Sequence, residues 1–367
     1  MKYTKILLCV LVLCVASAKG LHNSLNLILV GDALLHKSVY EDAYIPKKLR
    51  YGSARYDFST MLELIAPITK KYDLAFYNQE TILGGTELGL STYPRFNSPK
   101  EFGINMLNIG FNLISLANNH TLDKGEKGVR SMLRFWRKRE AKHKEIYTTG
   151  SFESIRARNK IQHKILQKNG ISYAMLAYTY GTNGIPLPKG KEYLVNIYTK
   201  EMLQSDIESI RKEVDLLIVS IHWGVEYTHK PTKEQRDIAK FLADLGVDIV
   251  IGNHPHAIQP IERIGDTLVF YALGNFISGQ VGLQKRVGMI ASVRISKSGI
   301  KNDSKRVKWS DVRADLIYTY YSQESQKMSG FKIYPFSLLS KKLLPRHESI
   351  YNNYLTIIKK DWITIGL

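Results

Sequence analysis

The sequence predicts a layered α/β protein built around one large domain. Short apolar and β-branched runs alternate with stretches whose apolar residues recur at helical spacing, and this alternation is typical of sheets covered by helices. Most of the apolar runs end in a turn rich in Gly, Asn, Asp or His, so the predicted strands deliver polar side chains to their carboxyl ends. The chain of 367 residues exceeds the usual size of a single core, which leaves room for an added C-terminal part.

The first residues have the pattern of an export signal. Residues 6–16 are apolar but too few to span a bilayer. Ala16-Ser17-Ala18 matches a cleavage site, so residues 1–18 are predicted to be a signal peptide, or a membrane anchor if they stay uncleaved. Both cysteines, Cys9 and Cys14, lie in this segment, so any metal bound by the exported chain must use nitrogen and oxygen ligands.

Three strands are predicted in the first half of the chain, and each ends in a polar turn. They cover residues 25–30, 73–77 and 111–116. Helices are predicted between them at residues 57–71, where Pro67 interrupts the pattern, and at residues 99–110. The turns after these three strands carry Asp32, then Asn78 and Glu80, then Asn119 and His120.

The second half continues the alternation. A helix is predicted at residues 124–138 and a strand at residues 171–178, followed by a glycine-rich turn in which Thr182 and Asn183 are interpreted as turn residues. The next strand, residues 214–221, ends at His222.

A well-defined helix and two more strands follow. Thr232 and Gln235 form a capping box at the start of the helix, and Gly246 closes it. The strand at residues 247–251 leads into Gly252-Asn253-His254-Pro255-His256, and the strand at residues 267–273 leads into Gly274-Asn275.

Five predicted strand ends therefore carry side chains that bind metals. A single His-x-His turn is more often a polar surface turn, but here the candidates gather at strand ends, which converge at one edge of a sheet. Carboxylates, Asn and His suit a site for one or two ions of Mn²⁺, Fe, Zn²⁺ or Mg²⁺. The candidates that follow the five strands are Asp32, Asn78 with Glu80, Asn119 with His120, His222, and His254 with His256.

The charge of the chain favours an anionic environment. Its formal net charge is +19, which suits anionic walls, phospholipid head groups or anionic capsules. The basic residues are scattered and do not alternate with aromatic residues in one stripe, so nucleic acid is not an expected partner. Beyond Lys305 the pattern weakens into a Tyr- and Lys-rich tail, and residues 301–367 are predicted to be a small C-terminal extension.

Six motifs in this order resemble the CapA/PgsA family of capsule and poly-γ-glutamate synthesis proteins, whose fold is similar to that of the calcineurin-like metallophosphoesterases. The resemblance covers residues 25–295 and implies a four-layer α/β/β/α domain, here at residues 19–300. The motifs are Gly31-Asp32, Asn78-x-Glu80, residues 117–125 (ANNHxxDxG), residues 222–226 (HWGxE), residues 252–259 (GNHPHxxQ) and residues 271–276 (YxLGNF).

The resemblance also implies roles for individual residues. His120 would face the substrate as an acid, and Asp123 would orient it. Ala33-Leu34 stands where phosphoesterases continue Asp-x-His, so one metal position would lack a ligand and be weak or empty, unless His36 compensates. The implied metal ligands are Asp32, Glu80, Asn119, His222, His254 and His256.

Two functions are compatible with these features. The first is an exported metal-dependent hydrolase of the cell envelope, acting on a phosphoester or on a γ-glutamyl amide, as the association with polyglutamate capsules implies. The second is a non-catalytic component of a membrane complex for polymer synthesis or export that binds an anionic polymer. The retained ligand residues favour the hydrolase, and the incomplete first motif favours the binding protein.

Overall fold

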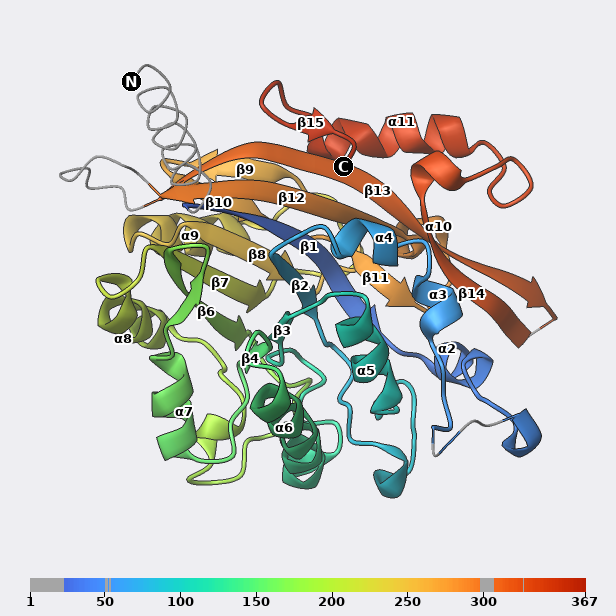
Figure 1. The fold of residues 1–367 in the computed structure, drawn as a ribbon, viewed down its shortest axis with the longest axis horizontal. Helices are drawn as coiled ribbons and strands as arrows, with labels where there is room; N and C mark the ends of the chain where they lie inside the picture. Colours follow the sequence, from blue (N-terminus) through green and yellow to red (C-terminus); the bar gives the residue numbers. More distant parts are fainter. Residues whose placement is uncertain (1–22, 50–51, 53, 298–306, 326) are drawn as a thin grey trace, which may run out of the picture.

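The computed structural model describes residues 23–49, 52, 54–297, 307–325 and 327–367. Two β-sheets pack face to face, and helices cover their outer faces (Figure 1). The predicted signal peptide, residues 1–18, lies outside the described residues, and so does the predicted domain boundary at residue 300. Within the described residues, every helix is too short or too polar to cross a bilayer.

The larger sheet is mixed and has nine strands in the described part of the chain. Its central strand, β1, runs parallel to β2 and β11 and antiparallel to β12. The path runs β14 (Lys327–Pro335), β13 (Val307–Glu324), β12 (Val287–Lys297), β1 (Ser24–Leu34), β2 (Leu74–Asn78), β3 (Leu113–Ser115) and β4 (Tyr147–Thr149), while β11 (Asn275–Ser278) pairs with β1 and β15 (Thr364–Ile365) with β13.

The smaller sheet has six strands among the described residues, and its four central strands are parallel. β5 and β9 pair antiparallel at its two edges. The strand order is β5 (Leu166–Lys168), β6 (Ile171–Thr179), β7 (Leu216–His222), β8 (Ile249–Asn253), β10 (Thr267–Phe270) and β9 (Ile261–Ile264).

Alternating side chains along each strand build two cores per sheet. In β1, Leu27 and Leu29 enter the core between the sheets, while Ile28 and Val30 face the helices on the other side. β7 behaves in the same way, because Ile218 points between the sheets and neighbouring residues point outward. Strands buried on both faces lack polar alternation, which explains why they appear in the sequence as continuous apolar runs.

Helices complete the outer layers, so the predicted four-layer α/β/β/α architecture is confirmed. Helices on the larger sheet share one core with it, and two helices share another with the smaller sheet. The helices on the larger sheet are α2 (Lys37–Asp42), α3 (Ser59–Leu62), α4 (Ala66–Thr69), α5 (Glu101–Asn108) and α6 (Gly125–Lys142), and those on the smaller sheet are α8 (Lys200–Arg211) and α9 (Lys233–Asp244). The connections contain α7 (Ile155–Gln162), α10 (Leu283–Arg286) and the 3-10 helices η1 (Lys47–Leu49), η2 (Thr86–Leu88) and η3 (Glu192–Leu194).

The C-terminal residues belong to the larger sheet. β13 pairs with β12 along almost the whole of β12, and Leu316 and Tyr318 of β13 are buried in the core between the sheets. After η4 (Phe336–Leu338), α11 (His347–Ile358) packs against the same core through Ile358 and lies over β13 (Figure 1). In the predicted extension, residues 301–367, the described residues 307–325 and 327–367 therefore add strands to the main sheet.

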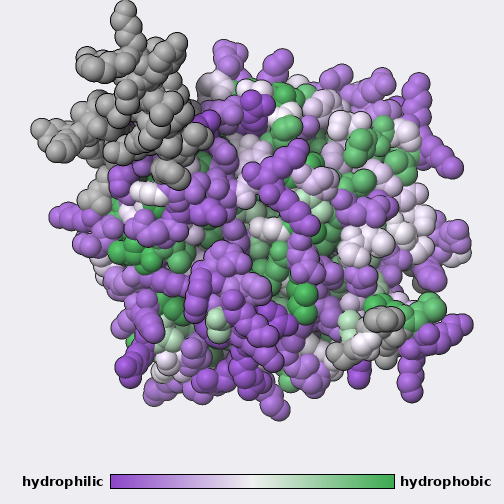
Figure 2. Space-filling model, viewed as in Figure 1, coloured by the Kyte–Doolittle hydropathy of each residue, from purple (hydrophilic) through white to green (hydrophobic). Residues whose placement is uncertain are grey.

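The surface seen in Figure 2 is mostly hydrophilic. Hydrophilic residues cover the region over α6, and hydrophobic residues appear in scattered patches (Figure 2). On α6 the exposed side includes Arg134, whereas Val129 and Trp136 are buried against the sheet. Exposed basic side chains of this helix, such as Arg134, are therefore solvated, as expected for an amphipathic surface helix.

Candidate metal centre

Three buried side chains from the two sheets form a possible metal site. Glu80 follows β2 of the larger sheet, and His254 and His256 follow β8 of the smaller sheet. Their ligand atoms all lie within 4.8 Å of one another. The carboxyl ends of strands from both sheets meet here, so the expectation that one sheet edge would carry all the ligands is wrong.

The other predicted ligands surround this group. Oε1 of Glu80 lies 3.6 Å from Nε2 of His222, and the same His222 nitrogen lies 2.9 Å from Oδ1 of Asn119. On the opposite side, Oδ2 of Asp32 lies 3.3 Å from Nδ1 of His256. Asn78 connects the two sides, because its Nδ2 donates to Oδ1 of Asp32 at 2.8 Å and lies 3.3 Å from Nδ1 of His222. The structure thus brings all six predicted ligands together.

The turn that carries the two histidines has an unusual backbone. His254 has φ of 99° and His256 has φ of 54°, a region that residues other than glycine adopt rarely and that is frequent at functional sites. The backbone N–H of His254 donates to Oδ2 of Asp32 at 3.2 Å, which fixes the turn against β1. Both side chains are buried, so this is not a surface turn.

Burial keeps His222 and His254 neutral. It lowers the pKa of His254 to about 3, with further lowering by the neighbouring His256 and His120, and it holds the pKa of His222 well below its usual range. Neutral imidazole is the form that binds metals. Burial first, and then the charges of Asp32 and Glu226, raise the pKa of Glu80 well above its usual range.

The site has buried acceptor atoms that a metal would satisfy. Both carboxylate oxygens of Glu80, Nδ1 of His254 and Oδ1 of Asn78 make no hydrogen bond. A buried polar atom without a partner costs about 1–3 kcal/mol. A divalent cation would satisfy several of these atoms at once, and it would balance the carboxylates of Asp32 and Glu80. The residues therefore fit a divalent metal.

A His-Asp pair lies beside the ligands. Nδ1 of His120 is 2.7 Å from Oδ2 of Asp123, and a carboxylate can only accept, so Nδ1 carries a proton. Asp123 also accepts from the backbone N–H of Phe96 at 2.6 Å, and the Phe96 ring stacks edge-on against His120 with centroids 4.7 Å apart. These contacts orient the ring and leave its Nε2 for another partner.

Comparison with protein families places the chain in a bacterial group. The family model described as "Bacterial capsule synthesis protein PGA_cap" matches residues 26–280, which include every predicted ligand and the His-Asp pair. The chain belongs to the PGA_cap family of bacterial capsule synthesis proteins. The family resemblance that the motifs indicated is confirmed.

The names of two curated relatives also refer to PGA or capsule biosynthesis. The chain is 30% identical over 198 residues to "PGA biosynthesis protein CapA" of Bacillus subtilis (strain 168), covering 52% of this chain and 49% of the relative. It is 31% identical over 175 residues to "Capsule biosynthesis protein CapA" of Bacillus anthracis, covering 47% of this chain and 41% of the relative. The chain spans about half the length or less of these relatives. The crystal structure of TT1561 of Thermus thermophilus aligns with 78% of this chain and 98% of its own, at 10% identity and a TM-score of 0.40.

Two residues of this PGA_cap protein lie at the site although sequence reasoning gave them no role there. Asn183, interpreted as a turn residue, places its Oδ1 3.2 Å from Nδ2 of Asn119 and its Nδ2 3.4 Å from Nδ1 of His120. Glu226 places Oε1 3.9 Å from Nε2 of His256. The signal for both was the one used for the ligands, a polar residue just beyond the end of a strand.

His36 does not join the ligand cluster. Its Nδ1 lies 3.2 Å from the carbonyl oxygen of Leu34 and accepts from the backbone N–H of Gly279 at 3.3 Å. Its ring packs edge-on against Phe96, with centroids 5.1 Å apart. These contacts indicate that His36 has a structural role next to the site. They do not support the idea that His36 replaces the missing ligand.

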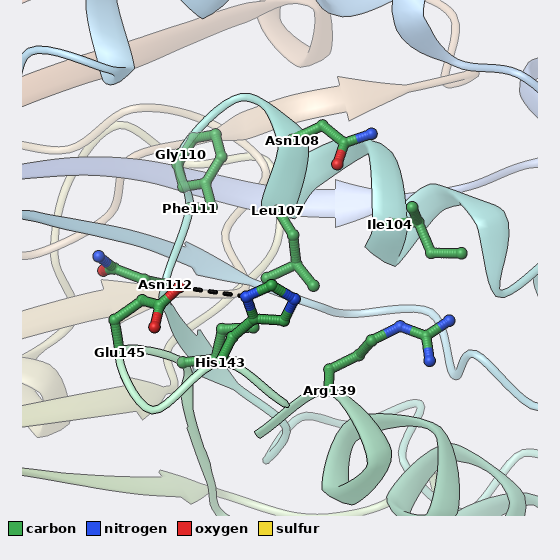
Figure 3. Close-up of a pocket in the computed structure, with 10 residues that line it drawn as sticks. Ile104, Leu107, Asn108, Gly110, Phe111, Asn112, Arg139, His143 and Glu145 are labelled. Atoms are coloured by element: carbon green, nitrogen blue, oxygen red, sulfur yellow. Dashed lines mark ion pairs between the residues drawn. The ribbon is translucent and has the colours of Figure 1, made fainter. Parts of the chain in front are cut away.

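A cavity of about 250 Å³ lies near the amino end of β3 in the larger sheet (Figure 3). Asn112, which lines it, precedes β3, whereas the metal centre follows the carboxyl ends of the strands. Its polar lining includes Arg139 and a surface pair in which His143 Nδ1 lies 3.5 Å from Glu145 Oε1. The cavity is thus separate from the candidate metal centre.

Proposed function

We propose that the chain is an exported, metal-dependent hydrolase of the cell envelope that acts in capsule or poly-γ-glutamate synthesis. One observation supports this most strongly. The buried, unpaired donors of Glu80 and His254 lie next to the ordered pair of His120 and Asp123. A metal site alone is compatible with simple binding, but a metal site next to an oriented proton donor is the arrangement that hydrolysis needs.

The metal would be held by ligands from both sheets. One or two divalent ions, drawn from Mn²⁺, Fe, Zn²⁺ and Mg²⁺, suit this set of oxygen and nitrogen donors. A bound ion supplies a nucleophilic water at neutral pH and stabilises negative charge on the substrate. The proposed ligands are Asp32, Glu80, Asn119, His222, His254 and His256.

His120 would act as the general acid and Asp123 as its positioning partner. With Nδ1 directed to Asp123, the protonated ring carries its second proton on Nε2. That proton would pass to the leaving oxygen of a phosphoester or to the leaving nitrogen of a γ-glutamyl amide. Asp123 would hold the ring in place and stabilise its charged form.

The N-terminal sequence and the net charge support the proposed location at the cell envelope. Residues 1–18 would direct export, residues 19–300 would form the catalytic domain, and residues 301–367 would extend it. The net charge of +19 would favour an anionic polymer or phosphoester substrate and a membrane complex that makes such a polymer. Family membership supports the link to capsules.

Metal analysis paired with a hydrolysis screen tests the proposal. Protein lacking residues 1–18 should hold at least one equivalent of a divalent metal and should hydrolyse a phosphomonoester, a phosphodiester or a γ-glutamyl anilide in a chelator-sensitive manner. His254→Ala and His256→Ala should each lower bound metal, while His143→Ala, at an exposed histidine far from the ligands, should not. Protein with no metal and no activity on any class would favour the non-catalytic, polymer-binding alternative.

A further inference from the structure

The donors of the proposed metal centre fall into two groups that share Glu80. Oε1 of Glu80 lies 3.6 Å from Nε2 of His222 and also 3.6 Å from Nε2 of His256. Two ligands of one ion, each about 2.1 Å from it in tetrahedral geometry, lie roughly 3.4 Å apart. Glu80 is therefore placed to bridge two ions, one beside each histidine.

The two groups differ in their number of metal donors. Asn119 and His254 lie next to His222, since Asn119 Oδ1 is 2.9 Å from His222 Nε2 and the rings of His222 and His254 have centroids 4.8 Å apart. With Glu80 this group offers four donors. Of the six predicted ligands, only Asp32 and Glu80 lie beside His256 in the second group. With three protein ligands, an ion beside His256 would have fewer protein donors than one beside His222, and its remaining positions would be filled by water or by a further side chain.

Glu226 lies beside the His256 group, which has fewer donors. Its Oε1 is 3.9 Å from Nε2 of His256, the nitrogen that also faces Glu80. Its side chain is 40% exposed, so the carboxylate can move toward an ion without breaking a packed core. The loop that carries it is fixed to the histidine turn, because the backbone N–H of Tyr227 donates to the carbonyl oxygen of Pro255 at 2.7 Å.

The carboxylates around His256 also favour a cation. Asp32, Glu80 and Glu226 all approach the one imidazole ring, and none of the ion pairs in the described part of the chain joins these three carboxylates to a lysine or arginine. Like charges gathered in a low-dielectric site repel strongly. A divalent ion in their midst would convert this repulsion into attraction.

We propose that Glu226 is a metal ligand and completes a second ion position formed with Asp32, Glu80 and His256. This inference rests on the proposed metal centre and adds a ligand from the loop between β7 and α9. It removes the apparent shortage caused by Ala33-Leu34, because a carboxylate from another loop supplies the missing donor. The site would then hold two ions bridged by Glu80.

Titration of metal-free protein with Mn²⁺ tests this inference. Calorimetry should show two equivalents bound by the wild type, and electron paramagnetic resonance should show the coupling of a two-ion centre. Glu226→Gln keeps the size of the side chain but removes its charge. This variant should bind one Mn²⁺ equivalent about 10- to 100-fold more weakly or worse, since loss of a residue that only supports a ligand already lowers metal affinity by this factor. It should also lose the coupled signal, and its affinity for the other equivalent should stay unchanged.

Controls separate the possible outcomes. Glu348→Gln removes the same charge at an exposed position on α11 and should match the wild type, and Glu226→Asp, which keeps a carboxylate, should restore part of the affinity. Two equivalents bound by Glu226→Gln with wild-type affinities would overturn the role of Glu226 while leaving the proposed hydrolase intact. A wild type that binds only one equivalent would also overturn it. A wild type that binds no Mn²⁺ would instead contradict the metal centre itself.

Discussion

At the scale of single residues, burial determines how the candidate ligands behave. Burial, and then the neighbouring histidines, lower the pKa values of His222 and His254, so protons compete weakly with a metal for their nitrogens. Glu80 has a raised pKa because it is buried near other carboxylates. The same burial that prepares the site for a cation makes the metal-free protein sensitive to acid.

The first prediction concerns this sensitivity. In the unfolded chain His254 takes up a proton near pH 6.5, whereas in the folded protein its pKa is about 3. Its contribution to stability is therefore lost as pH falls from 6.5 toward 3, by about 1.4 kcal/mol per pH unit. His254→Ala should remove this part, so the free energy of unfolding of the metal-free variant should fall less steeply with acid.

Urea denaturation in the presence of a chelator, at several pH values between 6.5 and 4.5, measures the two slopes. Glu80, whose raised pKa contributes the opposite slope, is present in both proteins, so the difference isolates His254. Equal slopes for the wild type and the variant would contradict a buried, neutral His254.

Most residues of the candidate site could be proposed from the sequence, and the reason is local. Asp32, Glu80, Asn119, His222 and His254 lie at or just beyond the ends of apolar runs, and parallel strands direct such residues to one end of a sheet. Asn183 also follows a strand end, but its glycine-rich turn explained its composition without a site, so this signal did not distinguish it from an ordinary turn residue. The carboxylate of Glu226 was visible in a motif, but its distance to His256 depends on how two loops pack.

At the scale of secondary-structure elements, close approach of backbones places the ligands. Gly31 precedes Asp32 in β1, and a Cβ added to it would lie 1.8 Å from the carbonyl oxygen of Gly274. That carbonyl accepts the backbone N–H of Asp32 at 2.9 Å. Only glycine allows β1 and the segment before β11 to come so close, and this contact fixes Asp32 at the site.

Gly31→Ala should therefore harm both fold and site. Overpacking costs about 1–3 kcal/mol, and the variant should also bind metal more weakly because Asp32 is displaced. The matched control is Gly181→Ala, since an added Cβ there meets no atom within 4 Å. Thermal unfolding and metal titration of the two variants provide the comparison, and a Gly31→Ala protein as stable as Gly181→Ala would contradict the close contact.

Predictions about elements were most accurate where a local signal was strong. The capping box of Thr232 and Gln235 is present at the start of α9, and all seven predicted strands appear within a few residues of the expected positions. That these strands divide between two sheets could not be predicted from periodicity. A strand buried on both faces has the same apolar pattern whether its neighbours belong to one sheet or another.

At the scale of the whole molecule, the C-terminal residues stabilise the sheet that carries Asp32 and Glu80. β13 covers the edge of β12, and Leu316, Tyr318 and Ile358 fill the core between the sheets. The tail appeared weakly patterned in sequence because β13 is long and partly exposed, with polar residues along its length. The polar residues on the exposed face of β13 made its contribution to the core difficult to predict.

Removal of residues 307–367 should therefore unfold the protein. The truncated chain would expose the edge and apolar face of β12, which favours aggregation. Size-exclusion chromatography and circular dichroism of chains 19–306 and 19–367 would measure this effect. A truncated chain that is monomeric and melts at the same temperature as the longer one would show that residues 19–300 form an independent domain.

The central claim, that this centre catalyses hydrolysis with His120 as the acid, is tested most directly by a series of substrates with leaving groups of graded pKa. For the wild type, the rate should depend only weakly on the leaving group, because His120 donates a proton to poor leaving groups. His120→Ala should keep its metal, lose about 10²- to 10⁴-fold in turnover of poor leaving groups, and recover toward wild-type rates as the leaving group improves. A variant that loses its metal, or that hydrolyses the poorest leaving groups as fast as the wild type, would contradict the claim.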